Sequence, residues 1–172
     1  MINLIELNSD DVIEWKIYRA EKLCTMFPLY EWHQIVADID NDTDWANFLT
    51  EYGEFVKCFV LYHRKDNNPI AFAYILQEDE YGNIVSLHGG GWNKSIIHTL
   101  LYYRGMVRLV ETLLNNGHKV RTACTIENDR AYRFIKSAGF VNYLNTDTFH
   151  YFWINKKRLY NSKIYKRFNV CC

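Results

Sequence analysis

His88 is a residue whose type and position could support chemistry. It ends the predicted strand 83–88, and an imidazole has a pKa near neutrality, so it can accept or release a proton under physiological conditions. His88 is therefore a candidate proton acceptor, although a lone histidine at a strand end is more often a polar residue at the rim of a sheet. No Ser/His/Asp or cysteine-nucleophile signature is present, which argues against a covalent enzyme intermediate.

Three glycines, Gly89–Gly91, follow His88 and precede a predicted long helix. Successive backbone N–H groups near the positive end of a helix dipole can hold an anion such as a phosphate, and Lys94 would add a positive charge. The same glycines could instead form a bulge that ends the strand, or a loop that lets Trp92 tuck in. A triple glycine alone does not decide between these interpretations.

The stretch NDRAYRFIKSAGF, residues 128–140, predicts a short helix between two strands. Asn128 is a suitable N-cap, because its side chain can satisfy the free N–H groups of the first turn. Gly139 is suited to end the helix, and Phe140 has the character of a core aromatic. The stretch is either ordinary packing or one side of a ligand site.

These residues are positioned by a long helix and the strands around it. Apolar residues spaced four, three, four, three and four apart predict a helix over 95–116, about 33 Å long, that ends at Gly117. The stripe consists of Ile96, Leu100, Tyr103, Val107, Val110 and Leu114. Strands are predicted over 54–64, 69–79, 83–88, 119–126, 140–145 and 149–155.

The first fifty residues predict an edge strand over 2–7 and then helices. Ser9 or Asp10 could cap a helix over 8–23, with acidic residues in its first turn, and further short helices are expected over 28–39 and 43–52.

The order of elements predicts an α/β (α+β) fold. A strand, long helix and strand over 84–126 form a right-handed βαβ crossover, which makes its two strands parallel. Short turns join the remaining strands, which should be antiparallel. We therefore expect a mixed, mostly antiparallel sheet of six to seven strands, with helices on both faces and a ligand crevice at the parallel pair.

Length and composition set the remaining bounds. The 172 residues favour a single domain, and 49% apolar residues are enough for a full core. Lys plus Arg equal Asp plus Glu at 20 each, so no net basic field is available to hold nucleic acid or an anionic membrane. Neither a signal peptide nor a membrane span is predicted. Five scattered cysteines lack zinc-ligand spacing, and no metal is expected. The three internal ones, Cys24, Cys58 and Cys124, suggest buried thiols in a reducing cytoplasm. The terminal pair Cys171–Cys172 could bind metal or oxidise, but a frayed end is the simpler interpretation.

Residues 53–153 resemble the GCN5-related N-acetyltransferase (GNAT) family in their order of elements. The sharpest match is the late motif of Asn, Ala, Gly and Phe, found here as Asn128, Ala131, Gly139 and Phe140. The resemblance implies acetyl-CoA as acyl donor, direct attack by an amine of a small molecule or peptide, and contact between the cofactor and Asn128. It also implies an acceptor side in 1–52, a cofactor-binding core in 53–153 and a basic C-terminal tail in 154–172.

The chain departs from the family at the phosphate-binding loop. Two positions that the family keeps small are Ser95 and Ile97 here, and a β-branched residue does not allow the close backbone approach that glycine does. The candidates for cofactor binding are nevertheless Gly90, Gly91, Trp92, Asn93, Lys94, Ser95, Asn128 and Ala131.

The proton-transfer groups depart as well. The family tyrosine that protonates the leaving thiolate corresponds to Ile135, and Tyr132, three residues earlier, is a poor substitute on geometry. His88 is the candidate base, since attack needs a neutral amine. Glu31 and His33 could line an acceptor pocket. The aromatic stretches 26–32 and 148–155 could form an acceptor groove or ordinary core, and the basic stretch 155–167 could meet a CoA phosphate or be a solvated face.

Two functions remain open on these grounds. One is an acetyl-CoA-dependent N-acetyltransferase; the other is a catalytically inactive relative that binds a ligand or protein through the same crevice. Nucleic-acid binding is disfavoured by the net charge of zero. The sheet edge and the aromatic hairpin are compatible with a homodimer.

Overall fold

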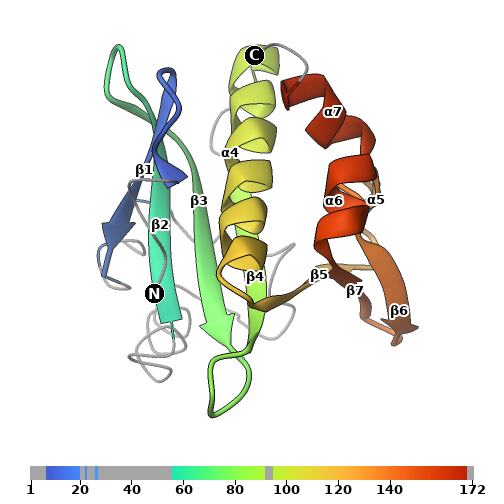
Figure 1. Cartoon of the computed structure of the whole chain (residues 1–172). Helices are drawn as coiled ribbons and strands as arrows, with labels where there is room; N and C mark the ends of the chain where they lie inside the picture. Colours follow the sequence, from blue (N-terminus) through green and yellow to red (C-terminus); the bar gives the residue numbers. More distant parts are fainter. Residues whose placement is uncertain (1–6, 20–21, 23–25, 27–55, 92–94, 170–172) are drawn as a thin grey trace.

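A computed structural model describes residues 7–19, 22, 26, 56–91 and 95–169 of the chain (Figure 1). Seven strands form one sheet in the order β1-β2-β3-β4-β5-β7-β6. The strands are β1 (Ile13–Tyr18), β2 (Val56–His63), β3 (Asn68–Gln77), β4 (Ile84–Gly91), β5 (Lys119–Thr125), β6 (Val141–Asn145) and β7 (Phe149–Ile154). The helices are α4 (Ile96–Asn115), α5 (Asp129–Ser137), α6 (Lys156–Asn161) and α7 (Lys163–Asn169).

The sheet is mixed, as the sequence predicts. β4 and β5 are parallel and are connected by α4, whereas the other neighbouring strands pair antiparallel. Among the described residues, α4 to α7 border one common core. The helices expected over 28–39 and 43–52, and residues 2–6 of the strand expected over 2–7, lie outside the described residues.

The core fills the space between the sheet and α4. Alternate residues of the strands, such as Leu61, Ala73 and Leu87, join it, because successive side chains of a strand point to opposite faces. α4 approaches closely at Gly105, where a Cβ atom would lie 2.6 Å from Leu61 Cδ2. The Trp15 indole donates to the Gly105 carbonyl at 3.1 Å. The glycine thus lets the helix backbone reach the sheet.

The helix predicted over 8–23 is wrong, because Ile13–Tyr18 form the edge strand β1. Ile13 and Trp15 are 2% exposed and face the core, while Glu14 and Lys16 point away from it. Asp10 does act as a cap, since its Oδ1 accepts from the Val12 and Ile13 amides at 2.9 and 3.3 Å. The cap precedes a strand, and pairing with β2 overrides the helical signal.

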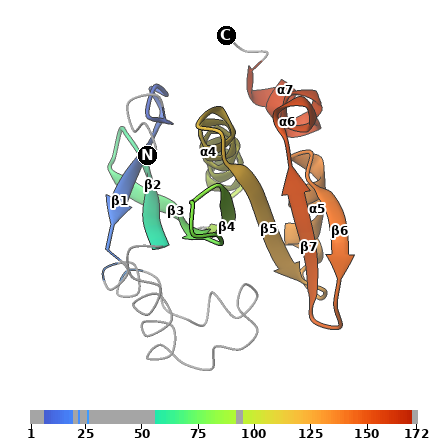
Figure 2. The same ribbon diagram turned by 60° about the horizontal axis from the view of Figure 1, so that its bottom comes forward.

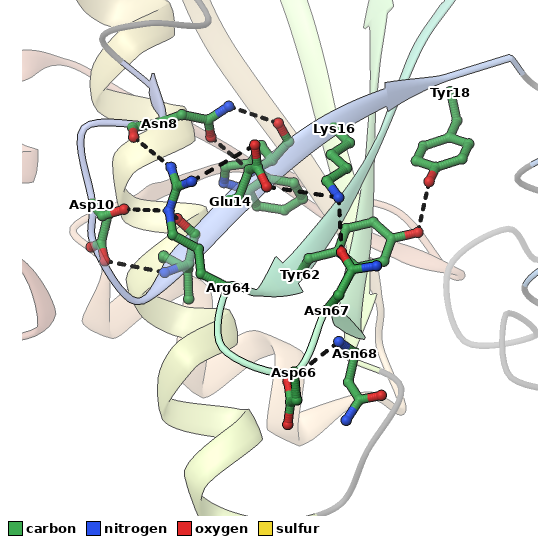
Figure 3. Close-up of polar contacts among 12 residues, drawn as sticks. Asn8, Asp10, Glu14, Lys16, Tyr18, Tyr62, Arg64, Asp66, Asn67 and Asn68 are labelled. Carbon is green, nitrogen blue, oxygen red and sulfur yellow. Dashed lines mark hydrogen bonds and ion pairs between the residues drawn. The ribbon is translucent and has the colours of Figure 1, made fainter.

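Side chains replace some of the hydrogen bonds that a further strand would give β1 (Figure 3). The Asn8 carboxamide accepts from the Trp15 amide at 2.7 Å and donates to the Trp15 carbonyl at 2.8 Å. Arg64, which follows β2, donates to the carbonyls of Asn8, Asp10 and Ile13. These contacts fix the segment before β1 against the sheet.

The Asp10 carboxylate ties the same segment to α4. Its Oδ2 lies 2.6 Å from Arg104 Nε and 3.0 Å from Arg108 Nε, and the Asp10 side chain is fully buried. Two guanidinium groups and two backbone amides therefore compensate the cost of burying one carboxylate.

Helix α4 matches the predicted range 95–116. Ser95 is its N-cap, and Gly117 after its end has φ +87°. The apolar stripe is buried only from the middle of the helix onward: Val107, Val110 and Leu114 are in the core, whereas Ile96 is 80% exposed. The first turn therefore projects beyond the core.

The described part of the basic segment 154–172 contains the helices α6 and α7. Leu159 of α6 is buried, and the Tyr165 hydroxyl donates to Glu111 of α4 at 2.7 Å. The lysines Lys156, Lys157, Lys163 and Lys166 are exposed, which fits a solvated basic face.

Gly139 ends α5 in a Schellman motif. It has φ +96°, its amide donates to Lys136, and the Phe140 amide donates to Ile135 at 3.2 Å. A Cβ atom on Gly139 would lie 2.6 Å from the Arg158 carbonyl oxygen. The predicted C-cap and core aromatic are thus confirmed, since Phe140 is 6% exposed.

We expect Gly139→Ala to destabilise the fold by about 3 kcal/mol or more, because backbone strain adds to a clash with α6. Gly117→Ala is the matched control: φ is similarly positive, but nothing lies within 4 Å, so only about 1–2 kcal/mol of strain is expected. Urea denaturation of both variants measures the difference. Equal losses would show that the contact with Arg158 carries no cost.

Candidate functional site

β4 and β5 stay together for only part of their length. They pair over Ile84–Ser86 and Lys119–Arg121, at the start of both strands. Beyond these three pairs β4 continues along β3 to Gly91, and β5 continues along β7 to Thr125. Figure 2 shows β5 directed away from β4. The parallel pair therefore opens, and one edge of β4 from Leu87 onward has no neighbouring strand within the described residues.

The three glycines belong to β4 rather than to a loop. Gly89, Gly90 and Gly91 pair with Ala73, Phe72 and Ala71. A Cβ atom on Gly89 would lie 2.7 Å from the Phe72 carbonyl oxygen and 3.3 Å from Met106 Cε, so packing alone requires that glycine. Gly90 and Gly91 line the part of β4 that has left β5. Trp92, Asn93 and Lys94 lie outside the described residues.

The first turn of α4 presents free amides. Ser95 Oγ accepts from the His98 amide at 3.1 Å, and the Thr99 amide donates to the Ser95 carbonyl. Among the described residues, the amides of Ile96 and Ile97 have no hydrogen-bond partner. The Ile96 and Ile97 side chains are 80% and 69% exposed, so they do not fill the helix end. This end of α4 can accept an anion despite its β-branched residues.

Arg130 brings a positive charge to the same place. It lies in the first turn of α5, and its Nη2 donates to Thr99 Oγ1 of α4 at 3.2 Å. Its guanidinium therefore stands beside the first turn of α4, where free amides already favour a negative group. No local pattern of residues indicates this contact, because Arg130 and Thr99 are 31 residues apart.

Asn128 is the N-cap of α5, as predicted. Its Oδ1 accepts from the Ala131 amide at 3.0 Å, which occupies the carboxamide oxygen and the Ala131 N–H together. The Asn128 Nδ2 group has no partner among the described residues, so a ligand contact through that nitrogen remains a prediction.

Aromatic rings fill the junction between α4 and α5. Phe134 stacks on Tyr103 at 4.2 Å between ring centroids and lies 5.8 Å from Tyr102. Tyr102 also faces the end of β4, since a Cβ atom on Gly91 would lie 3.8 Å from its ring. Burial, the largest cause, and the neighbouring Tyr103 raise the pKa of Tyr102, so its hydroxyl stays protonated.

The two positions considered for a general acid have packing contacts. Ile135, at the place of the family tyrosine, is 7% exposed and belongs to the core. The Tyr132 ring is edge-on to His150 and Phe152 at 5.0 and 5.5 Å, so it lies against β7.

His88 lies on the face of β4 opposite α4, because its neighbours Leu87 and Gly89 face the helix. Its ring stacks on Tyr74 of β3 at 5.0 Å, with 17° between the planes. Nε2 is 2.8 Å from Ser86 Oγ, and Nδ1 is shielded from solvent without a partner in the described part of the chain. Burial lowers the pKa of His88 to about 4, so the ring is neutral at pH 7.

The hairpin β6–β7 has an apolar side and an exposed side. Phe152 and Ile154 are buried in the core, whereas Trp153 on the opposite face is 37% exposed and Tyr143 is 46% exposed. Within the stretch 148–155, Phe152 and Ile154 therefore belong to the core, whereas Trp153 between them is partly exposed.

Several sequence predictions concern other groups. Glu31 and His33 lie outside the described residues. No three His, Cys, Asp or Glu side chains come together as a metal site in the part of the chain that the structure describes. None of the described helices is both long and apolar enough to cross a membrane. Cys58 and Cys124 are buried, and no disulfide joins them within the described part of the chain.

No known family's sequence profile matches the chain, and no curated protein matches it either. Solved structures do. AAC(6')-Ib in complex with paromomycin and acetyl-CoA superimposes with a TM-score of 0.65 at 18% identity, over 89% of this chain and 98% of that one. The chain has the GNAT fold.

Two further GNAT-fold structures are similar over most of their length. FdhC, a nucleotide-linked sugar GNAT, gives a TM-score of 0.63 at 15% identity, over 92% of this chain and 94% of that one. A spermidine N-acetyltransferase from Vibrio cholerae, bound to CoA and spermine, gives 0.63 at 11% identity, over 88% and 100%. Superpositions of this quality at such low sequence identity establish the fold of the present chain but not its chemistry, which depends on its own residues.

The burial of His88 predicts a pH-dependent stability. Its pKa falls from 6.5 to about 4 in the folded chain, so between these values the unfolded state binds more protons than the folded state. The contribution of the neutral His88 ring to the free energy of unfolding is fully present above pH 6.5. It falls by about 3 kcal/mol as the pH decreases from 6.5 to 4.

We expect His88→Asn to flatten this dependence in urea denaturation between pH 7 and pH 4.5. The matched control His63→Asn changes a histidine in β2 that bonds Asp66 in the following turn. This variant should keep the wild-type change in the free energy of unfolding between pH 7 and pH 4.5 that we attribute to His88. An unchanged slope in His88→Asn would contradict the burial of a neutral ring.

Proposed function

We propose that this protein is an acetyl-CoA-dependent N-acetyltransferase that acts on an amine of a small molecule or peptide. The observation that carries the proposal is the opening of β4 and β5 beside a helix end with free amides. Structures of similar fold, which contain acetyl-CoA with paromomycin or CoA with spermine, support the choice of cofactor and acceptor.

The pyrophosphate of the cofactor would bind at the first turn of α4. The Ile96 and Ile97 amides supply N–H donors, and Arg130 supplies a charge that the family's glycine loop does not need. Lys94 would add a second cation, with Trp92, Asn93 and Ser95 forming the approach to the helix. In this arrangement the positive charges of Arg130 and Lys94 would attract the pyrophosphate, in place of the close approach to backbone that glycine allows.

The pantetheine arm would lie in the opening. Its amide groups can hydrogen-bond to the free edge of β4 around Gly90 and Gly91, as an added strand does. On the other side the arm would pass the start of α5, where the free Nδ2 of Asn128 can donate to it and Ala131 leaves room. The arm would thereby place the thioester between the two strands.

Proton transfer would use His88. The reaction joins the amine nitrogen to the acetyl carbon, breaks the C–S bond and leaves one proton to be removed from nitrogen. His88 is neutral at pH 7, and protonating its ring in the resting protein costs about 4 kcal/mol. Such a weak base does not deprotonate a free ammonium ion, but it can accept the proton once attack has begun.

The leaving thiolate needs less help. A thiol has a pKa of about 8.5, so its thiolate leaves without full protonation and can take a proton from water. The packing of Tyr132 against β7 gives no support for its role as the acid, and no acid from the protein is required. The absence of a tyrosine at Ile135 is therefore compatible with activity.

The acceptor would be cationic before it reacts. Residues 27–55, between β1 and β2 in the chain, carry no Lys or Arg but seven acidic residues: Glu31, Asp38, Asp40, Asp42, Asp44, Glu51 and Glu54. Such a charge excess attracts amines that are protonated in solution. We propose Glu31 and His33 as residues that line the acceptor pocket.

Calorimetric titration with acetyl-CoA tests the cofactor, and mass spectrometry of spermine, paromomycin and a lysine peptide after incubation tests transfer. We expect binding in the micromolar range and a mass increase of one acetyl group on at least one amine. Binding without transfer to any amine would favour the catalytically inactive alternative. No binding at millimolar acetyl-CoA would overturn the proposal.

Arg130→Ala should weaken acetyl-CoA binding about tenfold, because a charge-assisted contact to phosphate is lost at a site that is only partly shielded from water. The effect should shrink at high salt. Arg133→Ala is the matched control: Arg133 is one turn further along α5, exposed, and bonded to the Asp129 carbonyl. Equal effects of the two variants would show that only the general charge of α5 matters.

A further inference from the structure

We propose that Ser86 is a positioning residue, which holds His88 in the tautomer with the proton on Nε2 and so leaves Nδ1 as the proton acceptor for the amine. The inference rests on the proposed function and assigns the reacting atom within it. No bound ligand is needed to examine the tautomer itself.

The two side chains are held together by the strand. Ser86 and His88 are two residues apart, so both project from the same face of β4. Ser86 is 7% exposed, and its Oγ lies 2.8 Å from Nε2. Tyr74, directly opposite His88 in the β3–β4 register, stacks on the imidazole and limits rotation of the ring. The ring therefore has one well-defined orientation.

The position of the pair relates it to the opening. Ser86 is the last residue of β4 that pairs with β5, where it is opposite Arg121. His88 follows after the strands have parted. Ser86 is thus fixed by pairing with β3 on one side and β5 on the other. It holds the His88 imidazole at the beginning of the gap between β4 and β5, where the thioester would lie.

The chemistry of an amine selects the tautomer. A neutral imidazole has one N–H donor and one acceptor nitrogen, whereas a serine hydroxyl can either donate or accept. If Nδ1 carried the proton, this buried atom would present a donor to a nucleophile that brings N–H donors of its own. If Nε2 donates to Ser86 Oγ, the Nδ1 lone pair is free to accept from the amine.

The unpartnered Nδ1 supports this choice. Buried polar atoms are normally hydrogen-bonded, and an exception calls for an explanation. Nδ1 of His88 is such an exception among the described residues. In the proposed step, the amine nitrogen bonds to the acetyl carbon, the C–S electron pair leaves on sulfur, and the nitrogen proton passes to Nδ1. The imidazolium keeps its Nε2–H bond to Ser86 and returns the added proton to water.

Nitrogen-15 NMR of histidine-labelled protein tests the inference, with His88→Gln to assign the signals. In the wild type we expect Nδ1 of His88 to be unprotonated and Nε2 to be protonated at pH 7. Ser86→Ala should give a mixture of both tautomers and lower kcat about tenfold for whichever amine is acetylated, with the Kd of acetyl-CoA unchanged. Ser86→Thr keeps the hydroxyl and should restore the single tautomer.

A proton on Nδ1 in the wild type would overturn the inference, as would an unchanged tautomer in Ser86→Ala. Its failure is distinguishable from failure of the proposed function. The wild-type spectrum reports Ser86 and His88 without any cofactor, whereas absent acetyl-CoA binding overturns the acetyltransferase and with it the catalytic role of the pair. A single Nε2–H tautomer together with transfer that Ser86→Ala slows supports both.

Discussion

The short pairing between β4 and β5 is the constraint on which the rest of the site depends. Three residue pairs join the strands, and after them each strand turns to its antiparallel neighbour. A parallel pair that continued would leave no free strand edge. Because β5 pairs with β7 and β4 pairs with β3, the described part of the sheet has an unpaired strand edge in its interior, beside the start of α4. We propose that this opening takes an extended ligand with amide groups.

The crossover helix is the second element of this arrangement, and its burial is uneven. The core holds it from Gly105 to Leu114, and Asp10 binds it through Arg104 and Arg108. Its first turn is left outside the core, with exposed side chains and with Ile96 and Ile97 amides that have no partner among the described residues. A helix anchored along its middle can present its N-terminus to a ligand without losing its position, because packing rather than the first turn holds it.

In the proposed site, charge takes the place that glycine has in the GNAT pattern. Close approach of the backbone to a pyrophosphate is hindered by β-branched residues in a loop, but the two isoleucines project into solvent here and leave their amides open. Arg130 reaches the same turn from α5. On the face of β4 opposite α4, Nδ1 of His88 is shielded from solvent and the ring is neutral at pH 7. The two environments fit the two ends of the proposed reaction, an anionic cofactor and an amine that must be neutral when it attacks.

The periodicity of the sequence was sufficient for most elements. Alternation and helical spacing predicted β2 to β7, α4 and α5, because each of these follows a local rule: two-residue alternation, a stripe along one helix face, or a glycine that ends a helix. The predicted caps Asn128 and Gly139 are local for the same reason. The strand β1 was mistaken for a helix, since Asp10 supplies the cap signal while pairing with the distant β2 decides the conformation.

The sequence by itself determined the fold class, the cap residues and the position of the candidate histidine, because these depend on neighbours within a few positions. Only the tertiary structure decided that the glycine run is part of a strand, that β4 and β5 separate after three pairs, and that Arg130 meets the first turn of α4. It also decided that Ser86 and Tyr74 hold His88, whose Nδ1 has no partner in the part of the chain that is described. These features arise from contacts between strands and helices far apart in the chain, and no local pattern of residue types records them.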